Sequence, residues 1–153
     1  MPRISVPVPM RWADLDAYGH VNNAAMLTLL EEARIATFWA TGDDRESAAT
    51  KVLAGGAGAS SYTLVARQEI EYLAPLEYRQ EPVQVELWIG RIGGASLEVC
   101  YEVHGPGGQV CARAATSIVM VDAASGRPRR LTDDERGALE PLLEEPIEFR
   151  RRG

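Results

Sequence analysis

The sequence predicts an α+β fold in which one curved antiparallel β-sheet wraps around a single long helix. A strand at residues 4–12 precedes an apolar helical stretch at residues 24–40, and segments of alternating polar and apolar residues follow. Alternation with a period of two is typical of antiparallel strands that bury one face. Because the helix and the sheet each have an apolar face that needs cover, we expect them to pack together. The later strands are expected at residues 62–72, 83–89, 96–104 and 109–122.

The composition is that of an ordinary globular protein, and we expect one domain over residues 1–153. Hydrophobic residues make up 46% of the chain and charged residues 25%, which suffices for a core without crosslinks. The net charge of −6 disfavours general binding to nucleic acid or to an anionic membrane. No secretion signal and no apolar run of roughly 20 residues is present, so membrane insertion is not expected. Cys100 and Cys111 are expected as reduced core residues of a cytoplasmic protein.

The stretch at residues 24–40 is the strongest helical signal in the chain. Met26, Leu29 and Ala33 recur at helical spacing, and further apolar residues occupy the remaining faces. A helix that is apolar around most of its circumference is expected to be buried on most sides. One helix and one sheet leave the outer face and the edges of the sheet open, which favours a homo-oligomer.

The remaining segments are less regular. Two prolines restrict the first strand to an edge of the sheet. Residues 43–61 are expected to form a glycine-rich loop with a short strand at residues 51–53. A capping-box pattern opens a short C-terminal helix at about residues 132–143, and the basic tail at residues 150–153 is expected to fray.

The segment directly before the long helix concentrates residues that can do chemistry. It carries Asp14, Asp16 and His20 around a turn that contains Gly19. A helix start has unpaired N–H groups and a partial positive charge, so acid–base side chains beside it can activate water and stabilise an oxyanion. Structural roles are also open: Asp16 can close an Asx-turn or cap the helix, and Asp14 can pair with Arg11.

The element order and several motifs resemble the hotdog-fold thioesterases, specifically the 4-hydroxybenzoyl-CoA thioesterase-like group. The resemblance covers roughly residues 4–131. The motifs that carry it are Arg11-Trp12-Ala13-Asp14-Leu15-Asp16, Gly19-His20-Val21-Asn22-Asn23, Glu32-Ala33-Arg34, Ile70-Glu71-Tyr72-Leu73-Ala74-Pro75 and Gly126-Arg127-Pro128-Arg129.

The resemblance implies an acyl-CoA thioesterase that hydrolyses its substrate to a free acid and CoA. Asp16 takes the place of the catalytic carboxylate, as nucleophile or general base, and backbone N–H groups between His20 and Asn23 take that of the oxyanion hole. Asn23 is the single choice for the oxyanion donor, and His20 is a candidate for orienting Asp16. The resemblance also implies a homodimer or homotetramer with acyl-CoA bound between subunits, and no metal or cofactor. Further substrate-binding candidates are Tyr18, Gly19, Val21 and Asn22, with Arg67 and Arg91 for the CoA phosphates.

Alternative functions remain open at this point. Plant-type acyl-carrier-protein thioesterases use an aspartate, an asparagine two residues on and a histidine two further; here Tyr18 stands at the asparagine position. A hotdog hydratase would need a different loop after its histidine. A non-catalytic acyl-CoA-binding module is the third alternative.

Other polar residues are expected to have structural roles. In some relatives a glutamate of the long helix is the catalytic acid, but Glu31 is expected to be solvated or paired with Arg34. His104 is expected on the surface of a strand. Two histidines so far apart, His20 and His104, predict no metal site between them.

Overall fold

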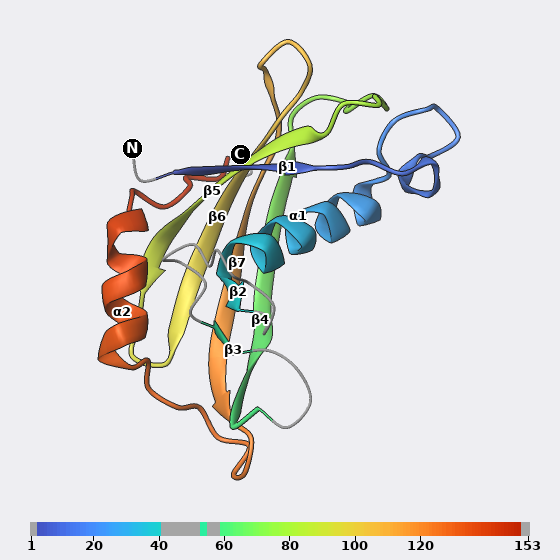
Figure 1. The fold of residues 1–153 in the computed structure, drawn as a ribbon. Coiled ribbons are helices and arrows are strands. Elements are labelled where there is room, and N and C mark those ends of the chain that lie inside the picture. Colours follow the sequence, from blue (N-terminus) through green and yellow to red (C-terminus); the bar gives the residue numbers. More distant parts are fainter. Residues whose placement is uncertain (1–2, 41–52, 55–58, 151–153) are drawn as a thin grey trace.

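The computed structural model describes residues 3–40, 53–54 and 59–150, and it confirms the predicted α+β class (Figure 1). A five-stranded sheet has the order β1-β5-β6-β7-β4, with every neighbouring pair antiparallel, and helix α1 lies against one face. The elements are β1 (Ile4–Val8), a 3-10 turn (Trp12–Asp14), α1 (Asn23–Phe38), β2 (Trp39–Ala40), β3 (Leu53–Ala54), β4 (Ser61–Tyr72), β5 (Val83–Ile92), β6 (Ser96–His104), β7 (Val110–Asp122), α2 (Asp133–Leu139) and a second 3-10 turn (Glu140–Leu142).

Strand β1 is an edge strand, as its prolines predict, but it is shorter than expected. It pairs with β5 only as far as Val8, because the chain turns at Trp12–Asp14. The side chain of Asp14 accepts the Arg11 N–H at 2.8 Å, which closes this turn with a capping-box contact. The turn delivers the chain to the start of α1.

Helix α1 buries one side against the sheet and leaves the other side exposed. Met26, Leu30 and Ala33 are at most 2% exposed within the core, whereas Ile35 is 41% exposed on the opposite side. The expectation of burial on most sides is therefore wrong for a single chain, since only one sheet is available to cover the helix. The helix also ends two residues earlier than expected, because Trp39 pairs with Leu53 in a short parallel ladder. The predicted strand residues 51–52, and most of the predicted glycine-rich loop, lie outside the described residues.

Strand β4 is an edge strand with apolar side chains in solvent. It pairs along its length with β7, and its other edge has no partner strand among the described residues. The predicted alternation assigned apolar residues of this strand to a buried face; in the single chain Tyr62, Leu64 and Tyr72 are 43%, 52% and 48% exposed. The sequence pattern thus predicted the strand correctly, but it did not show that the apolar side chains of this strand are not covered by the core of the single chain.

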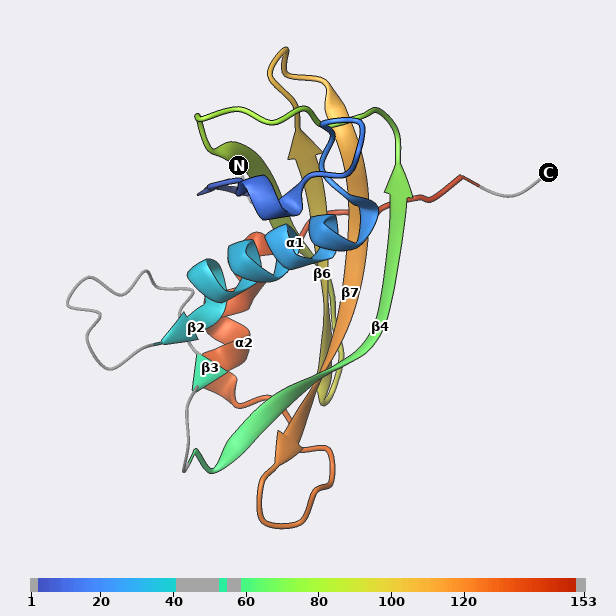
Figure 2. The same cartoon turned by 90° about the vertical axis from the view of Figure 1, so that its right-hand side faces the viewer.

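The C-terminal segment covers part of the face that was expected to be open. After α2, whose capping box at Thr132 and Glu135 is formed as predicted, the chain passes to the far side of the sheet (Figure 2). There the Trp88 indole donates to the carbonyl of Glu145 at 3.0 Å, and a Cβ at Gly90 would lie 3.2 Å from the Cα of Pro146. Trp88 and Cys100 occupy outward strand positions and are nonetheless at most 1% exposed. Residues 151–153 of the predicted tail lie outside the described part.

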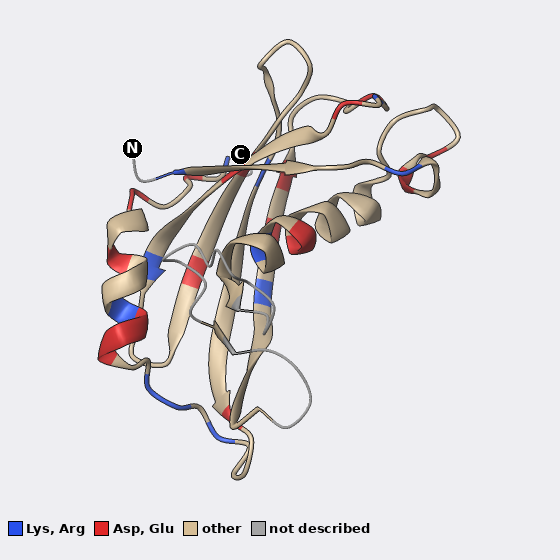
Figure 3. Ribbon diagram, in the orientation of Figure 1, with Lys and Arg blue, Asp and Glu red and all other residues tan. Residues whose placement is uncertain are grey.

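The charged residues of the described chain do not form one basic face. The arginines, drawn blue, are spread over several of its elements (Figure 3), in keeping with the net charge of −6. No helix within residues 3–40, 53–54 or 59–150 is long and apolar enough to cross a membrane.

Candidate active site

Asp16 organises the turn that precedes α1. One of its carboxylate oxygens, Oδ1, accepts the N–H groups of Tyr18 at 2.8 Å and His20 at 3.2 Å. Gly19 adopts a φ of 78°, a conformation that other residues rarely adopt, so the chain can reverse here. The Asx-turn role considered from the sequence is therefore real. It uses only one oxygen, and Oδ2 has no recorded hydrogen-bond partner among the described residues.

Asp14 has a structural role, as its pairing with Arg11 predicted. Its side chain is 1% exposed and lies 2.9 Å from the guanidinium of Arg11, which holds the pKa of Asp14 below its ordinary value. Both of its oxygens are occupied by Arg11. Of the two motif aspartates, only Asp16 keeps an oxygen available for chemistry.

The helix start offers fewer free N–H groups than the resemblance implied. His20 N–H is taken by Asp16, Val21 N–H by the carbonyl of Leu76 at 2.8 Å, and Asn22 N–H by the carbonyl of Asp14 at 2.7 Å. Asn22 is the N-cap, and its side chain accepts the Ala24 N–H at 2.8 Å. Within the described residues, Asn23 N–H has no recorded acceptor. Of the four amides proposed for the oxyanion, this one alone is available.

A hollow of about 360 Å³ lies beside Asp16 and the first turn of α1. On its far side runs the segment that follows β4, which sequence reasoning linked to the family motif without giving it a role. At the last residue of β4, the Tyr72 hydroxyl donates to the carbonyl of Asn23 at 2.6 Å, which joins the end of this strand to the helix start. The lining residues are Asp16, His20, Val21, Asn23, Met26, Tyr72, Leu73, Ala74, Pro75 and Leu76.

A second hollow of about 310 Å³ adjoins the first. It shares His20, Ala74 and Pro75 with it and extends to Pro106 and Gln109 at the turn between β6 and β7. His20 therefore lines both hollows.

The structure does not bring all the predicted binding residues together. Tyr18 is 84% exposed and, like Gly19 and Asn22, is not among the residues that line the first hollow. Arg67 and Arg91 line a different hollow of about 290 Å³ under the C-terminal segment, which shares no residue with the first. Within one chain they are therefore separated from Asp16, on the outer face of the sheet, and their binding of the CoA phosphates stays a prediction.

The two remaining predictions have different outcomes. Arg34 is 4% exposed, lies 3.8 Å from Glu31 and donates to the Tyr101 hydroxyl at 3.0 Å, so Glu31 is paired as expected. His104 is not a plain surface residue: its ring lies between the carboxylates of Glu86 and Glu102. Sequence reasoning missed this grouping because its members come from two different strands.

Comparison with known proteins places the chain in a family. The model of the thioesterase-like superfamily matches residues 10–141, and the chain belongs to that superfamily. The fold is similar to that of a predicted thioesterase from Bacillus stearothermophilus, with a TM-score of 0.75 and 26% identity over 95% of this chain and 99% of that chain. The hotdog-fold thioesterase resemblance is thereby confirmed.

Two further relatives are informative. A thioesterase from Thermus thermophilus, whose crystal structure is a complex with coenzyme A and Zn, is 30% identical, with a TM-score of 0.70 over 95% of this chain and 97% of that one. YsmA of Bacillus subtilis, an uncharacterized protein, is 27% identical over 132 residues, which are 86% of this chain and 82% of YsmA.

Proposed function

We propose that this protein hydrolyses an acyl-CoA thioester to a free acid and CoA. The observation that carries the proposal is the meeting of two groups on one hollow: the Asp16 carboxylate, with one oxygen unused, and the amide of Asn23 at the start of α1. Acyl transfer needs both groups. The carboxylate acts as the nucleophile or the general base, and the amide N–H stabilises the negative charge that develops on the carbonyl oxygen.

In the proposed mechanism the thioester carbonyl lies between these two groups. The Tyr18 and His20 amides hold Oδ1 of Asp16 and thereby orient Oδ2. Oδ2 either attacks the carbonyl carbon and forms a mixed anhydride, or removes a proton from a water that attacks it. The resulting oxyanion accepts a hydrogen bond from the Asn23 N–H, and the tetrahedral intermediate then expels the CoA thiolate, which takes up a proton. On the nucleophilic route a water next hydrolyses the mixed anhydride, which releases the free acid and restores the Asp16 carboxylate. A thioester is electrophilic enough for this chemistry, so we expect no metal or cofactor.

The substrate class and the assembly are part of the proposal. The complex of the Thermus thermophilus thioesterase with coenzyme A supports a CoA thioester as substrate. The open β4 edge and the exposed side of α1 support a homodimer or homotetramer, in which a second copy supplies the remaining walls of the site. A cytoplasmic location fits the two free, buried cysteines.

The test is a thiol-release assay with short-chain, long-chain and aromatic acyl-CoA thioesters. Asp16→Asn is the sharpest variant, because an asparagine oxygen can still accept the two turn N–H groups that Oδ1 accepts now. We expect a folded protein whose kcat falls by at least about 10²-fold, the range for a lost general base. Asp134→Asn, an exposed aspartate on α2, is the matched control and keeps wild-type turnover.

Three results would change the assignment. Wild-type turnover by Asp16→Asn would remove Asp16 from the mechanism. Release of thiol from acyl carrier protein thioesters but from no acyl-CoA would show that the substrate carrier is acyl carrier protein. Tight binding of every acyl-CoA without thiol release would show a binding module. If hydrolysis is found, a single turnover in ¹⁸O-labelled water separates the two roles of Asp16, because only a nucleophilic Asp16 takes up the label.

A further inference from the structure

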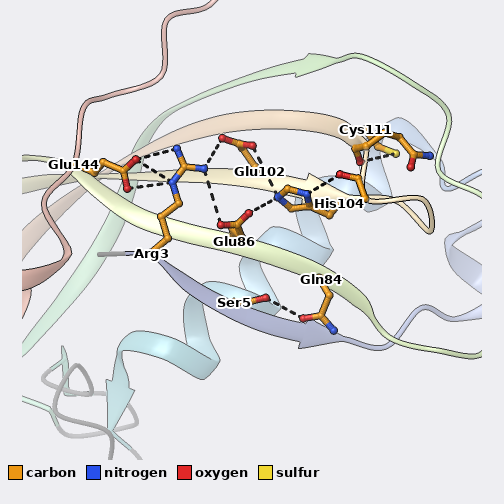
Figure 4. A network of polar contacts seen from close by, with 10 residues as sticks. Arg3, Ser5, Gln84, Glu86, Glu102, His104, Cys111 and Glu144 are labelled. Atoms are coloured by element: carbon orange, nitrogen blue, oxygen red, sulfur yellow. Dashed lines mark hydrogen bonds and ion pairs between the residues drawn. The ribbon is translucent and has the colours of Figure 1, made fainter. Parts of the chain in front are cut away.

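The outer face of the sheet carries a second cluster of ionisable side chains, away from the hollow beside α1. Glu86 of β5 and Glu102 of β6 lie directly opposite each other in the ladder, and His104 follows two residues along β6. Figure 4 shows the carboxylates of Glu86 and Glu102 between the imidazole of His104 on one side and the guanidinium of Arg3 on the other. None of these four residues lines the hollow that contains Asp16.

The ring nitrogen Nε2 of His104 is the centre of this cluster. It lies 2.5 Å from Oε1 of Glu86 and 3.9 Å from Oε2 of Glu102, and the three candidate ligand atoms are within 4.8 Å of one another. Nε2 is buried from solvent and makes no hydrogen bond to any described residue, although Glu86 is so close. The carboxylate oxygen therefore lies off the direction in which an Nε2–H would donate. The contact with Glu86 is therefore either an ion pair or the place where a cation lies between the two groups.

His104 and the two glutamates each have a second polar atom that contacts another residue. The atoms that face one another are then available for a common ligand. Nδ1 of His104 lies 3.3 Å from the carbonyl of Gly108; a proton on Nδ1 donates there and leaves the Nε2 lone pair facing the carboxylates. Nη1 of Arg3 lies 2.6 Å from the outer oxygen of Glu102 and 4.0 Å from that of Glu86. Outer contacts that fix a tautomer and a carboxylate orientation are typical of metal sites.

Arg3 does not neutralise the cluster. It is held by Glu144, with Nε 3.1 Å from each carboxylate oxygen, and its guanidinium lies 3.9 Å from the centre of the Trp88 ring. One guanidinium among the carboxylates of Glu86, Glu102 and Glu144 leaves two negative charges. A divalent cation balances them, whereas a proton on His104 balances only one.

We propose that Oε1 of Glu86, Oε2 of Glu102 and Nε2 of His104 bind one divalent transition-metal ion, for which Zn²⁺ is the best match. One imidazole and two carboxylates are a borderline ligand set that suits Zn²⁺, whereas Ca²⁺ and Mg²⁺ favour oxygen ligands alone. Tetrahedral Zn²⁺ holds its ligand atoms about 3.4 Å apart. On binding, the 2.5 Å distance from Nε2 to Glu86 therefore increases, and the 3.9 Å distance from Nε2 to Glu102 decreases. The bound ion joins β5 to β6 at the end of their ladder, and the site is independent of the proposed hydrolysis.

The test is a titration of chelator-treated full-length protein with ZnCl₂ alone, followed by calorimetry, and with CoCl₂, followed by visible absorption. We expect one equivalent to bind, with Co²⁺ bands of a low-coordinate nitrogen and oxygen site. His104→Gln and Glu102→Gln each weaken binding by at least about tenfold, the usual loss even for outer contacts of a metal site. Glu98→Gln, on the same face of β6 but outside the cluster, binds as the wild type does.

The control variants make the negative results equally clear. Absence of saturable binding by the wild type overturns the proposal and leaves the cluster as an ion-pair network closed by a protonated imidazole. Binding that survives in folded His104→Gln and Glu102→Gln, or that is lost in His20→Gln instead, places the ion elsewhere and also overturns it. Circular dichroism shows which variants are folded, and Glu102→Gln keeps the test valid if His104→Gln is not.

Discussion

Replacing Asn23 with proline tests the proposed oxyanion donor by removing a single N–H group. Proline lacks this hydrogen, and the first position of a helix is where it is best tolerated. The residue before a proline must be extended, and Asn22 already has φ −59° and ψ 142°. The Asn23 carbonyl, which accepts the Tyr72 hydroxyl, is kept. We therefore expect the free energy of unfolding to change by less than about 1 kcal/mol.

The expected effect on catalysis is much larger. Loss of one oxyanion donor costs about 3–4 kcal/mol of transition-state stabilisation, which is about 10²–10³-fold in kcat. The amides of His20, Val21 and Asn22 cannot substitute, because each already has an acceptor. The measurement is kcat for thiol release from the best acyl-CoA of the screen, together with thermal unfolding of the same preparation.

Asn23→Ala is the matched control, since it removes the side chain but keeps the N–H. We expect its kcat to stay close to that of the wild type. A folded Asn23→Pro protein with wild-type kcat would refute the assignment of this amide. Equal losses in both variants would show that the side chain of Asn23 acts instead.

Two further predictions concern stability and assembly. Glu135→Gln removes the paired contacts from Arg129, both 2.8 Å, which hold the pKa of Glu135 below its usual 4.5; we expect a loss of about 2 kcal/mol at pH 7 by chemical denaturation. A group with a lowered folded-state pKa contributes its full stabilisation above the unfolded pKa and loses it as the pH falls through the folded value. The difference from the wild type should therefore shrink as the pH falls below 4.5, and a constant difference down to pH 3 would contradict this prediction. Leu64→Asp places a charge on the open β4 face, so we expect light scattering to show the monomer mass of 16.7 kDa, whereas Ala124→Asp, an exposed turn control, keeps the oligomer. A monomeric wild type would contradict the proposed assembly.

The elements of this fold were predictable because their signals are local. Alternation located the four long strands, and the apolar stretch located α1 to within two residues at its C-terminal end. The capping box at Thr132 and Glu135 located α2, since the two side chains satisfy each other's backbone N–H groups three residues apart. The parallel pairing of Trp39 with Leu53 was not predictable, because no local pattern encodes a partner so distant along the chain.

The candidate site was predictable in part. The turn motif singled out Asp16, His20 and Asn23, and the structure brings these three residues to one hollow. The motif could not place Tyr72 beside Asn23, since the two residues are brought together only by the packing of β4 alongside α1. Arg67 was assigned by charge alone, and charge does not say on which side of a sheet a residue lies.

The sequence by itself determined which residues form strands and helices and which turn precedes the long helix, because those properties depend on near neighbours. Only the tertiary structure decided which groups remain available. Long-range contacts occupy the amides of Val21 and Asn22 and leave that of Asn23. Strand pairing sets Glu86 opposite Glu102, with the ring of His104 beside both carboxylates. The physical reason is that a hydrogen-bonding group is consumed or left free by whatever packs beside it, and its neighbours in space are not its neighbours in sequence.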